Sequence, residues 1–258
     1  MTTPIHSTAI VDLRAQIGDG CEIGPYCIVG PNVKLGEGSR LHSHVILDGL
    51  TTIGPRCEIY PFACIGLKTQ DLKHKGGKCH LEIGSDNVFR EHVTVHTATD
   101  DGGVTRIGSH GNFLAYSHVA HDCQVGSHVI FSNCGTLAGH VLVEDYVVIG
   151  GLAAIHQFCR IGTMSIIGGC AKVVQDVPPY MIADGNPAET RGVNKVGLER
   201  HGVSEEVQRG LREAYKIMFR EGLTVSNALD TVTAKVPPSS ELAHLIDFCR
   251  KSERGIAR

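Results

Sequence analysis

Four of the histidines in the middle of the chain could carry out chemistry: His118, His121, His140 and His156. Histidine is the side chain best suited to proton transfer near neutral pH, and Asp122 directly follows His121. A carboxylate beside an imidazole can fix the tautomer that a general base needs. Gly139 stands eighteen positions after His121, and its accessible backbone N–H could stabilise an oxyanion. These residues indicate acyl transfer by general-base catalysis; the alternative is a non-catalytic cluster on a His-rich surface.

The sequence shows no pattern of covalent catalysis: a GxSxG motif and a Gly-rich phosphate loop are both absent. The rival hypothesis is a metal-binding or scaffold protein without transferase activity, because three histidines on neighbouring subunits could hold zinc. The spacing found in γ-class carbonic anhydrases is not met, since the required positions hold Ser85, Cys123 and Gly126.

A six-residue repeat must position these residues. Aliphatic residues occupy every sixth position from Ile5 to Ile65. The six-residue step resumes from Ile83 to Val95 and from Ile107 to Val173, with Phe at three of its positions. This period fits neither a helix nor a two-faced strand, but it fits a chain that turns a corner every six residues. Three sides make an 18-residue coil, so residues eighteen positions apart stack. His121 therefore lies under Gly139, facing outward, and Asp122 lies under His140.

The sequence predicts a mainly β fold in two domains: a parallel β-helix of hexapeptide repeats over residues 1–177 and a C-terminal α-helical domain over residues 178–258. Val177-Pro-Pro-Tyr180 breaks the repeat. Helical spacing then begins at Ser204, and two further helices are expected over 224–236 and 239–250.

The repeat is interrupted between Gly66 and Glu82 and again over residues 96–106. Insertions in a solenoid become loops on one face, which is often the binding face. The first insertion, residues 67–76, is polar and charged, so it suits a flap over a polar substrate; a solvated loop is the alternative.

Composition excludes other classes of protein. The net charge of −3 argues against a nucleic-acid partner. The sequence has no run of 18 apolar residues, so it predicts no membrane-spanning helix. The first residues show no signal-peptide pattern, so we expect a cytoplasmic protein. Ten cysteines without a CxxC pair are expected to be small buried hydrophobic residues.

Seven stretches carry a resemblance to a known family: GLKTQDLKHKG (66–76), FREHVTVH (89–96), AYSHVAHDCQVG (115–126), TLAGHVLVEDYVVIGGLAAIHQFCRIG (136–162), GGCAKVVQDVPPYMIADGNPAE (168–189), GVNKVGLERHG (192–202) and RGIAR (254–258). Essentially end to end, the chain resembles the cytoplasmic UDP-N-acetylglucosamine O-acyltransferases that begin lipid A synthesis. The resemblance also implies that the β-helix is left-handed, which the residues alone do not predict.

The resemblance implies transfer of an R-3-hydroxyacyl group from acyl carrier protein to the glucosamine 3-hydroxyl of UDP-N-acetylglucosamine. It makes His121 the general base, Asp122 its orienting partner and the N–H of Gly139 the oxyanion donor. It also implies substrate contacts at these residues: Gln70, Asp71, Lys73, His118, His140, His156, Gln157, Asn194 and Arg200. Gly169 matches the floor of the acyl groove, where a missing side chain admits a longer acyl chain.

The resemblance further implies a homotrimer with sites between subunits, a flap that reaches the site from the neighbouring subunit, and no metal or cofactor. The acidic donor protein makes four basic residues plausible docking contacts, although an ordinary charged helix face is the alternative: Arg209, Arg212, Lys216 and Arg220.

The sequence departs from the family pattern at Val196, where an acidic residue is usual, and at His201, where a basic residue is usual. Residues 96–99 read HTAT in place of HRGT. The first two departures predict altered uridine contacts. Acylation of a 3-amino sugar nucleotide, which some relatives catalyse, remains an open alternative.

Overall fold

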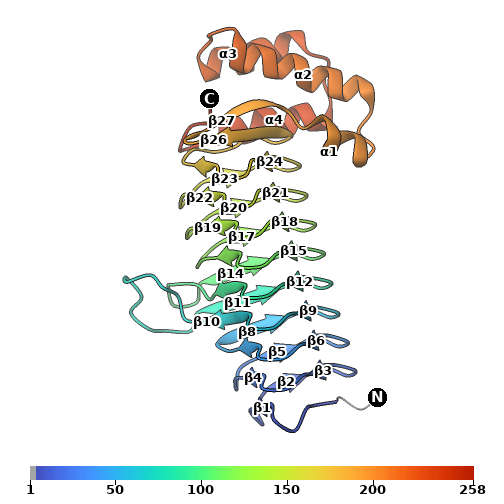
Figure 1. Cartoon of the computed structure of the whole chain (residues 1–258). Coiled ribbons are helices and arrows are strands. Elements are labelled where there is room, and N and C mark those ends of the chain that lie inside the picture. The colour runs from blue at the N-terminus through green and yellow to red at the C-terminus, as the bar shows by residue number, and fades with distance from the viewer. Residues whose placement is uncertain (1–3) are drawn as a thin grey trace.

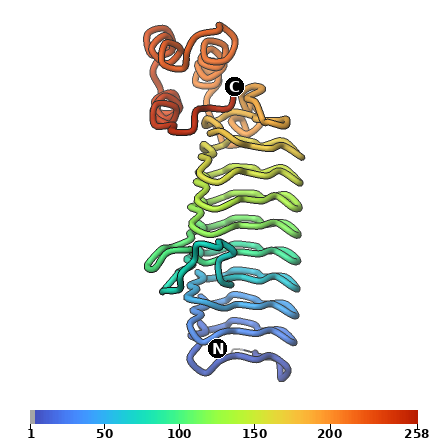
Figure 2. Tube along the Cα trace, turned by 90° about the vertical axis from the view of Figure 1, so that its left-hand side faces the viewer, coloured from blue at the N-terminus to red at the C-terminus, as the bar shows by residue number. Residues whose placement is uncertain are grey.

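The structure, a computed structural model, describes residues 4–258, so residues 1–3 of the predicted β-helix lie outside the described part. Short strands stack into a column of coils, and helices cover its C-terminal end (Figure 1). The tube in Figure 2 shows the same column from the side, with loops projecting from one edge. The predicted fold class, a parallel β-helix followed by an α-helical part, is confirmed.

Three sheets form the faces of the column, and each is named here by a numeral. Face I contains β1 (Ile10–Val11), β4 (Ile28–Val29), β7 (Ile46–Leu47), β10 (Cys64–Leu67), β13 (Thr94–His96), β16 (His118–Val119), β19 (Thr136–Leu137), β22 (Ala154–Ile155) and β25 (Lys172–Val173). Face II contains β2 (Gln16–Ile17), β5 (Lys34–Leu35), β8 (Leu50–Ile53), β11 (His80–Ile83), β14 (Val104–Ile107), β17 (Gln124–Val125), β20 (Leu142–Val143) and β23 (Arg160–Ile161). Face III contains β3 (Glu22–Ile23), β6 (Arg40–Leu41), β9 (Glu58–Ile59), β12 (Val88–Phe89), β15 (Asn112–Phe113), β18 (Ile130–Phe131), β21 (Val148–Ile149), β24 (Ile166–Ile167), β26 (Met181–Gly185) and β27 (Ala188–Val193). The faces meet at corners I–II, II–III and III–I.

The six-residue repeat explains the packing of each coil. The predicted aliphatic residue, such as Ile59 or Leu137, is the inward residue of its strand and is fully buried. Coils join through backbone hydrogen bonds, as where the Thr136 N–H donates to the Ala153 carbonyl at 2.9 Å. Ile5 differs from the prediction because it remains 47% exposed: among residues 4–258 it pairs with the following coil, at Ile23, and no described coil covers its other side.

Two long connections interrupt the stack where the sequence predicted. The first, residues 68–79, joins β10 to β11 and is called the flap below; the second insert, residues 97–103, joins β13 to β14. Each connection leaves face I and returns on face II. Both therefore project from corner I–II, on the same edge of the column (Figure 2).

The C-terminal part begins with an antiparallel hairpin that the sequence analysis did not predict. Its strand β26 pairs with β24 and so extends face III, while β27 pairs with β26. The hairpin lacks the six-residue period, which is why the repeat gave no signal for it. Four helices follow: α1 (Lys195–Arg200), α2 (Glu205–Arg220), α3 (Val225–Lys235) and α4 (Ser240–Arg250).

The three predicted helices α2, α3 and α4 are confirmed. Each begins after a hydroxyl residue, Ser204, Thr224 or Ser239, whose side chain accepts a hydrogen bond from a backbone N–H of the first turn. Helix α1 was not predicted; it is a short helix capped by Asn194. No helix within residues 4–258 combines the length and apolar character needed to cross a membrane.

All ten cysteines lie within the described residues and are free thiols. Seven are buried, as expected for small hydrophobic residues in the core. The expectation is wrong for Cys170, which is exposed because it occupies an outward corner position with a φ of 59°.

Candidate active site

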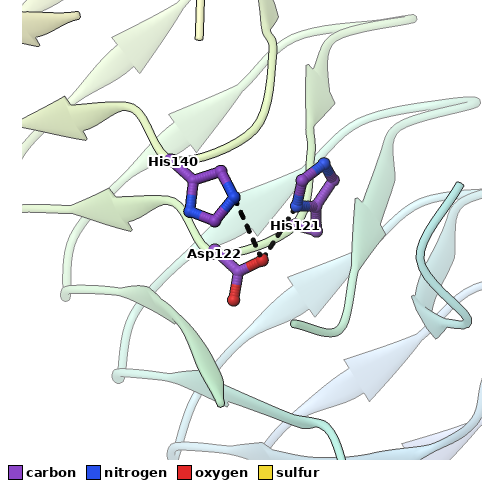
Figure 3. A group of neighbouring side chains, drawn as sticks. All are labelled: His121, Asp122 and His140. Atoms are coloured by element: carbon purple, nitrogen blue, oxygen red, sulfur yellow. Dashed lines mark hydrogen bonds and ion pairs between the residues drawn. The ribbon is translucent and has the colours of Figure 1, made fainter. Parts of the chain in front are cut away.

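His121 and Asp122 lie side by side at corner I–II, between β16 and β17 (Figure 3). Their side chains meet at 2.8 Å, from Nδ1 of His121 to Oδ2 of Asp122. The carboxylate therefore accepts the Nδ1 proton, which leaves the Nε2 lone pair free to receive another proton. This is the tautomer that a general base requires.

Asp122 is itself held in place by two threonines. Its Oδ2 accepts the Thr99 N–H at 3.1 Å, and its own N–H donates to the Thr105 hydroxyl at 2.8 Å. Its backbone has a φ of 59°, the left-handed conformation that turns the corner. Asp122 is thus held by Thr99 of the second insert and by Thr105 of β14. Its carboxylate is therefore pre-organised to orient the imidazole.

Gly139 lies directly against the ring of His121, as the 18-residue coil predicted. A Cβ at this position would stand 2.3 Å from Cε1 and 2.4 Å from Nε2 of the imidazole. Any side chain at residue 139 would therefore displace the ring. Among residues 4–258, no protein acceptor is recorded for the Gly139 N–H, so it can donate to a ligand.

His140 stands over Asp122, also as predicted, with its Nε2 3.8 Å from Oδ2 of the carboxylate (Figure 3). The ring of His140 stacks on Phe158, with centroids 4.7 Å apart. Phe158 was missed by the sequence analysis. Its position eighteen residues after His140 was the signal that could have found it.

The flap brings Asp71 to the other side of the imidazole. Its Oδ2 lies 3.9 Å from Nε2 of His121 in the same chain. The flap thus folds back over its own corner. That it also reaches the site of a neighbouring subunit stays a prediction. A hydrogen bond from the Lys73 N–H, with His121 nearby, lowers the pKa of Asp71. The Gln70 and Lys73 side chains are exposed on the flap.

Two further histidines extend the site onto face I. His118 shares a 2.7 Å hydrogen bond with Thr94, and burial lowers its pKa to about 4, so it is neutral at pH 7. His96, which the sequence analysis did not single out, is 4% exposed, and its Nδ1 has no partner among the described residues. The rings of His96 and His118 lie 5.1 Å apart.

The other predicted residues lie further along the column. His156 and Gln157 are exposed at corner I–II one coil beyond His140, and Nδ1 of His156 donates to the Gln157 carbonyl at 3.0 Å. Gly169 is exposed at corner III–I, across face I from His121. The outward residues of face I between these corners run in register: His118, Thr136, Ala154 and Lys172.

The predicted nucleotide contacts lie elsewhere. The Asn194 side chain caps α1: it donates to the Met164 carbonyl at 2.7 Å and accepts the Gly197 N–H at 2.9 Å. Arg200 is exposed at the end of α1. The ring of His201 lies 4.5 Å from that of Tyr146, at corner II–III. A single chain therefore does not bring these residues beside His121.

His121, Asp122 and His140 also offer three atoms within 4.8 Å of one another, which is close enough to hold a metal ion. The 2.8 Å contact between Nδ1 and Oδ2 has the length of a hydrogen bond to a charged group. The pair is therefore accounted for as an imidazole oriented by a carboxylate, with no ion needed to explain it.

Comparisons with known proteins match both parts of the chain. Residues 176–257 match a family described as UDP N-acetylglucosamine O-acyltransferase, domain 2. Residues 14–49 match the bacterial transferase hexapeptide family (six repeats).

Whole-length matches point the same way. An acyl-[acyl-carrier-protein]–UDP-N-acetylglucosamine O-acyltransferase of Anaeromyxobacter dehalogenans is 50% identical, over 98% of this chain and 99% of the relative. The solved structure of LpxA from Acinetobacter baumannii is 48% identical with a TM-score of 0.95, covering 98% of this chain and 99% of that one. LpxA of Bacteroides fragilis, titled a UDP-N-acetylglucosamine acyltransferase, is 37% identical with a TM-score of 0.95, covering 98% and 100% of the two chains.

Proposed function

The chain belongs to the acyl-[acyl-carrier-protein]–UDP-N-acetylglucosamine O-acyltransferase family, and from that premise we propose how its residues perform the reaction. The enzyme is an acyltransferase that uses acyl carrier protein as donor and UDP-N-acetylglucosamine as acceptor. In the proposed reaction it moves an R-3-hydroxyacyl group to the glucosamine 3-hydroxyl, the first step of lipid A synthesis. The observation that carries the mechanism is the 2.8 Å bond that leaves Nε2 of His121 free.

The proposed chemistry has two proton transfers and no covalent enzyme intermediate. Nε2 of His121 takes the proton of the sugar 3-hydroxyl, while the oxygen of that hydroxyl attacks the thioester carbonyl carbon. The negative charge that develops on the carbonyl oxygen is stabilised by the Gly139 N–H. The carbon–sulfur bond then breaks, and the imidazolium returns its proton to the departing thiolate. Asp122 stabilises the imidazolium between the two transfers.

We propose that the sugar and diphosphate lie at corner I–II. Side chains that could bond them gather there from the flap and three successive coils: Gln70, Asp71, Lys73, His118, His140, His156 and Gln157. The neutral state of His118 suits it to hydrogen bonding with an uncharged group rather than to pairing with phosphate. The relatives' names specify O-acylation, so the 3-amino acceptor is not favoured.

The acyl chain is proposed to cross face I toward Gly169. The outward residues Thr136 and Ala154 are small, which leaves the face open between the two corners. A Cβ at residue 169 would come no closer than 3.4 Å to protein, at the Gly151 carbonyl. A side chain there would fit without disturbing the backbone and would shorten the groove.

We propose a homotrimer in which a neighbouring subunit completes the nucleotide site. Large apolar residues near the N-terminal end are exposed in the single chain, among them Ile10 at 67% and Leu13 at 102%. Subunit contact would cover them. The same packing would bring Asn194 and Arg200 of one copy toward His121 of another.

The carrier protein is proposed to dock on α2. Arg209, Lys216 and Arg220 are exposed there, opposite the face that packs on the core. Arg212 is bound to Glu205 at 2.6 Å and Lys216 lies 3.5 Å from Glu213, so these two are partly neutralised. Arg209 and Arg220 are therefore the stronger candidates for pairing with an acidic partner.

Release of the carrier thiol tests the proposal directly. The protein is mixed with R-3-hydroxyacyl carrier protein and UDP-N-acetylglucosamine, and free thiol is measured with and without the sugar nucleotide. We expect His121→Ala to lower kcat by about 10³-fold, because a general base contributes on this scale. The matched control is His92→Ala, an exposed corner histidine stacked between Phe62 and Tyr116. Equal, sugar-independent release by wild type and His121→Ala would refute the function.

Gly169→Met tests the acyl groove. The variant is expected to shift donor preference toward shorter acyl chains, because the new side chain would occupy the end of the groove. The measurement is kcat/KM across donors of graded length. An unchanged chain-length profile would remove Gly169 from the groove while leaving the assignment of His121 intact.

A further inference from the structure

Thr99, in the second insert, uses its N–H, its hydroxyl and its carbonyl to contact three other residues. It is 4% exposed. Its N–H donates to Asp122, its hydroxyl lies 3.0 Å from the Thr69 hydroxyl, and its carbonyl accepts Nδ1 of His74 at 2.7 Å. Thr69 and His74 both belong to the flap. One buried residue thus joins the flap to the carboxylate that orients His121.

The contacts continue from Thr69 back to the imidazole. The Thr69 hydroxyl accepts the Asp71 N–H at 3.0 Å, and Oδ2 of Asp71 lies 3.9 Å from Nε2 of His121. The chain of contacts from His121 through Asp122, Thr99, Thr69 and Asp71 therefore closes on His121. One carboxylate faces each ring nitrogen, and Thr99 lies on the path between them.

We propose that Thr99 is a positioning residue that couples the flap to the general base. The Thr99 hydroxyl holds the flap in the position where Asp71 faces Nε2 of His121. The Thr99 N–H holds Asp122 against Nδ1 of the same ring. The flap position and the imidazole orientation are then set together rather than separately. This inference rests on the proposed role of His121.

The coupling predicts a specific pattern of defects. Thr99→Val keeps the N–H and the shape but removes the hydroxyl, so we expect kcat/KM to fall about tenfold, a loss typical of one buried hydrogen bond together with flap disorder. Thr99→Ser restores the hydroxyl and should recover most of the activity. Combined with Asp71→Asn, Thr99→Val should cost little more than Asp71→Asn alone, because both changes act through the same carboxylate.

A second measurement does not depend on activity. Amide hydrogen exchange of residues 68–79 should become faster in Thr99→Val, since the flap loses its anchor. The matched control is Thr190→Val: Thr190 is also buried, and its hydroxyl donates to the Ala257 carbonyl at 2.7 Å, in the C-terminal part. That variant should leave both flap exchange and kcat/KM near wild-type values. If Thr99→Val is too unstable to study, Thr69→Val breaks the same contact from the flap side, together with the bond that the Asp71 N–H donates to the Thr69 hydroxyl.

Three results would overturn the coupling: unchanged flap exchange in Thr99→Val, a loss of activity that Thr99→Ser does not recover, or fully additive losses with Asp71→Asn. Failure of the proposed function is a different result, because His121→Ala would then retain the wild-type rate. An active wild type, an inactive His121→Ala and an unaffected Thr99→Val would reject only this inference.

Discussion

Two histidine–carboxylate pairs in this molecule have nearly the same geometry and different surroundings. His121 bonds Asp122 at 2.8 Å at corner I–II, and His244 of α4 bonds Glu144 at 2.7 Å at corner II–III. In each pair the carboxylate oxygen also accepts a backbone N–H, from Thr99 at 3.1 Å and from Thr163 at 2.8 Å. The hydrogen bond between imidazole and carboxylate therefore does not by itself distinguish a catalytic pair.

The difference lies at the ring nitrogen that the carboxylate does not bind. For His121 that nitrogen is Nε2, which packs on Gly139 and faces Asp71 on the flap. His244 uses Nε2 for the bond to Glu144, and this contact ties α4 to the β-helix. The comparison indicates that the glycine and the flap around its second nitrogen make the His121 pair suited to catalysis, while the His244 pair attaches α4 to the β-helix.

The sharpest test of this distinction removes one charge from each pair. Asp122→Asn is expected to lower kcat on the order of 100-fold, because an amide can hold His121 in the tautomer that has no free lone pair at Nε2. Glu144→Gln should change kcat less than about twofold, since it affects only the attachment of α4. Carrier-thiol release under saturating substrates measures both. Comparable losses in the two variants would mean that the two pairs do not differ in function.

Gly139→Ala tests the packing beside Nε2 of His121. The new methyl group would stand 2.3 Å from Cε1 of His121, so the ring must move, and a displacement of this size is expected to lower kcat at least about tenfold. Gly192→Ala in β27 is the matched control, because no atom lies within 4 Å of its Cβ. Wild-type turnover by Gly139→Ala would show that catalysis does not require the ring to pack on this residue.

The repeat explains how much of the site the sequence could predict. Counting in steps of eighteen placed Gly139 against His121 and His140 over Asp122, because both pairs lie within uninterrupted coils. Thr69, Asp71 and Thr99 lie in the two inserts, where the period no longer relates sequence distance to position. The repeat therefore gave no position for the flap or for Thr99.

The contact between His244 and Glu144 at corner II–III could not be predicted from the sequence, for a related reason. Its partners are 100 positions apart, in two parts of the chain that share no period. Helices α2, α3 and α4 were predicted from their caps and spacing, but these signals do not say which face of a helix meets the β-helix. The contact of His244 with Glu144 is decided by that packing alone.

The smallest expected effect concerns the pH dependence of the His244–Glu144 pair. The hydrogen bond to Glu144 raises the pKa of His244, against burial and with further help from Asp247, while Arg160 opposes the shift. A histidine whose pKa is raised by folding contributes stability that is fully present below its unfolded pKa of about 6.5, and that is lost as pH rises through the folded value. His244→Gln should therefore lower the Tm more at pH 5.5 than at pH 8.5.

The size of this effect is limited by exposure, because the His244 side chain is 37% accessible and solvent screens the pair. A contribution of about 1 kcal/mol or less corresponds to about 2–4 °C in a protein of this length. Glu144→Gln should show the same pH dependence, since it removes the same charge interaction from the other side. Thermal unfolding at the two pH values measures both variants. A gap between wild type and variant that is equal at both pH values, or larger at pH 8.5, would show that His244 holds α4 through packing and not through its charge.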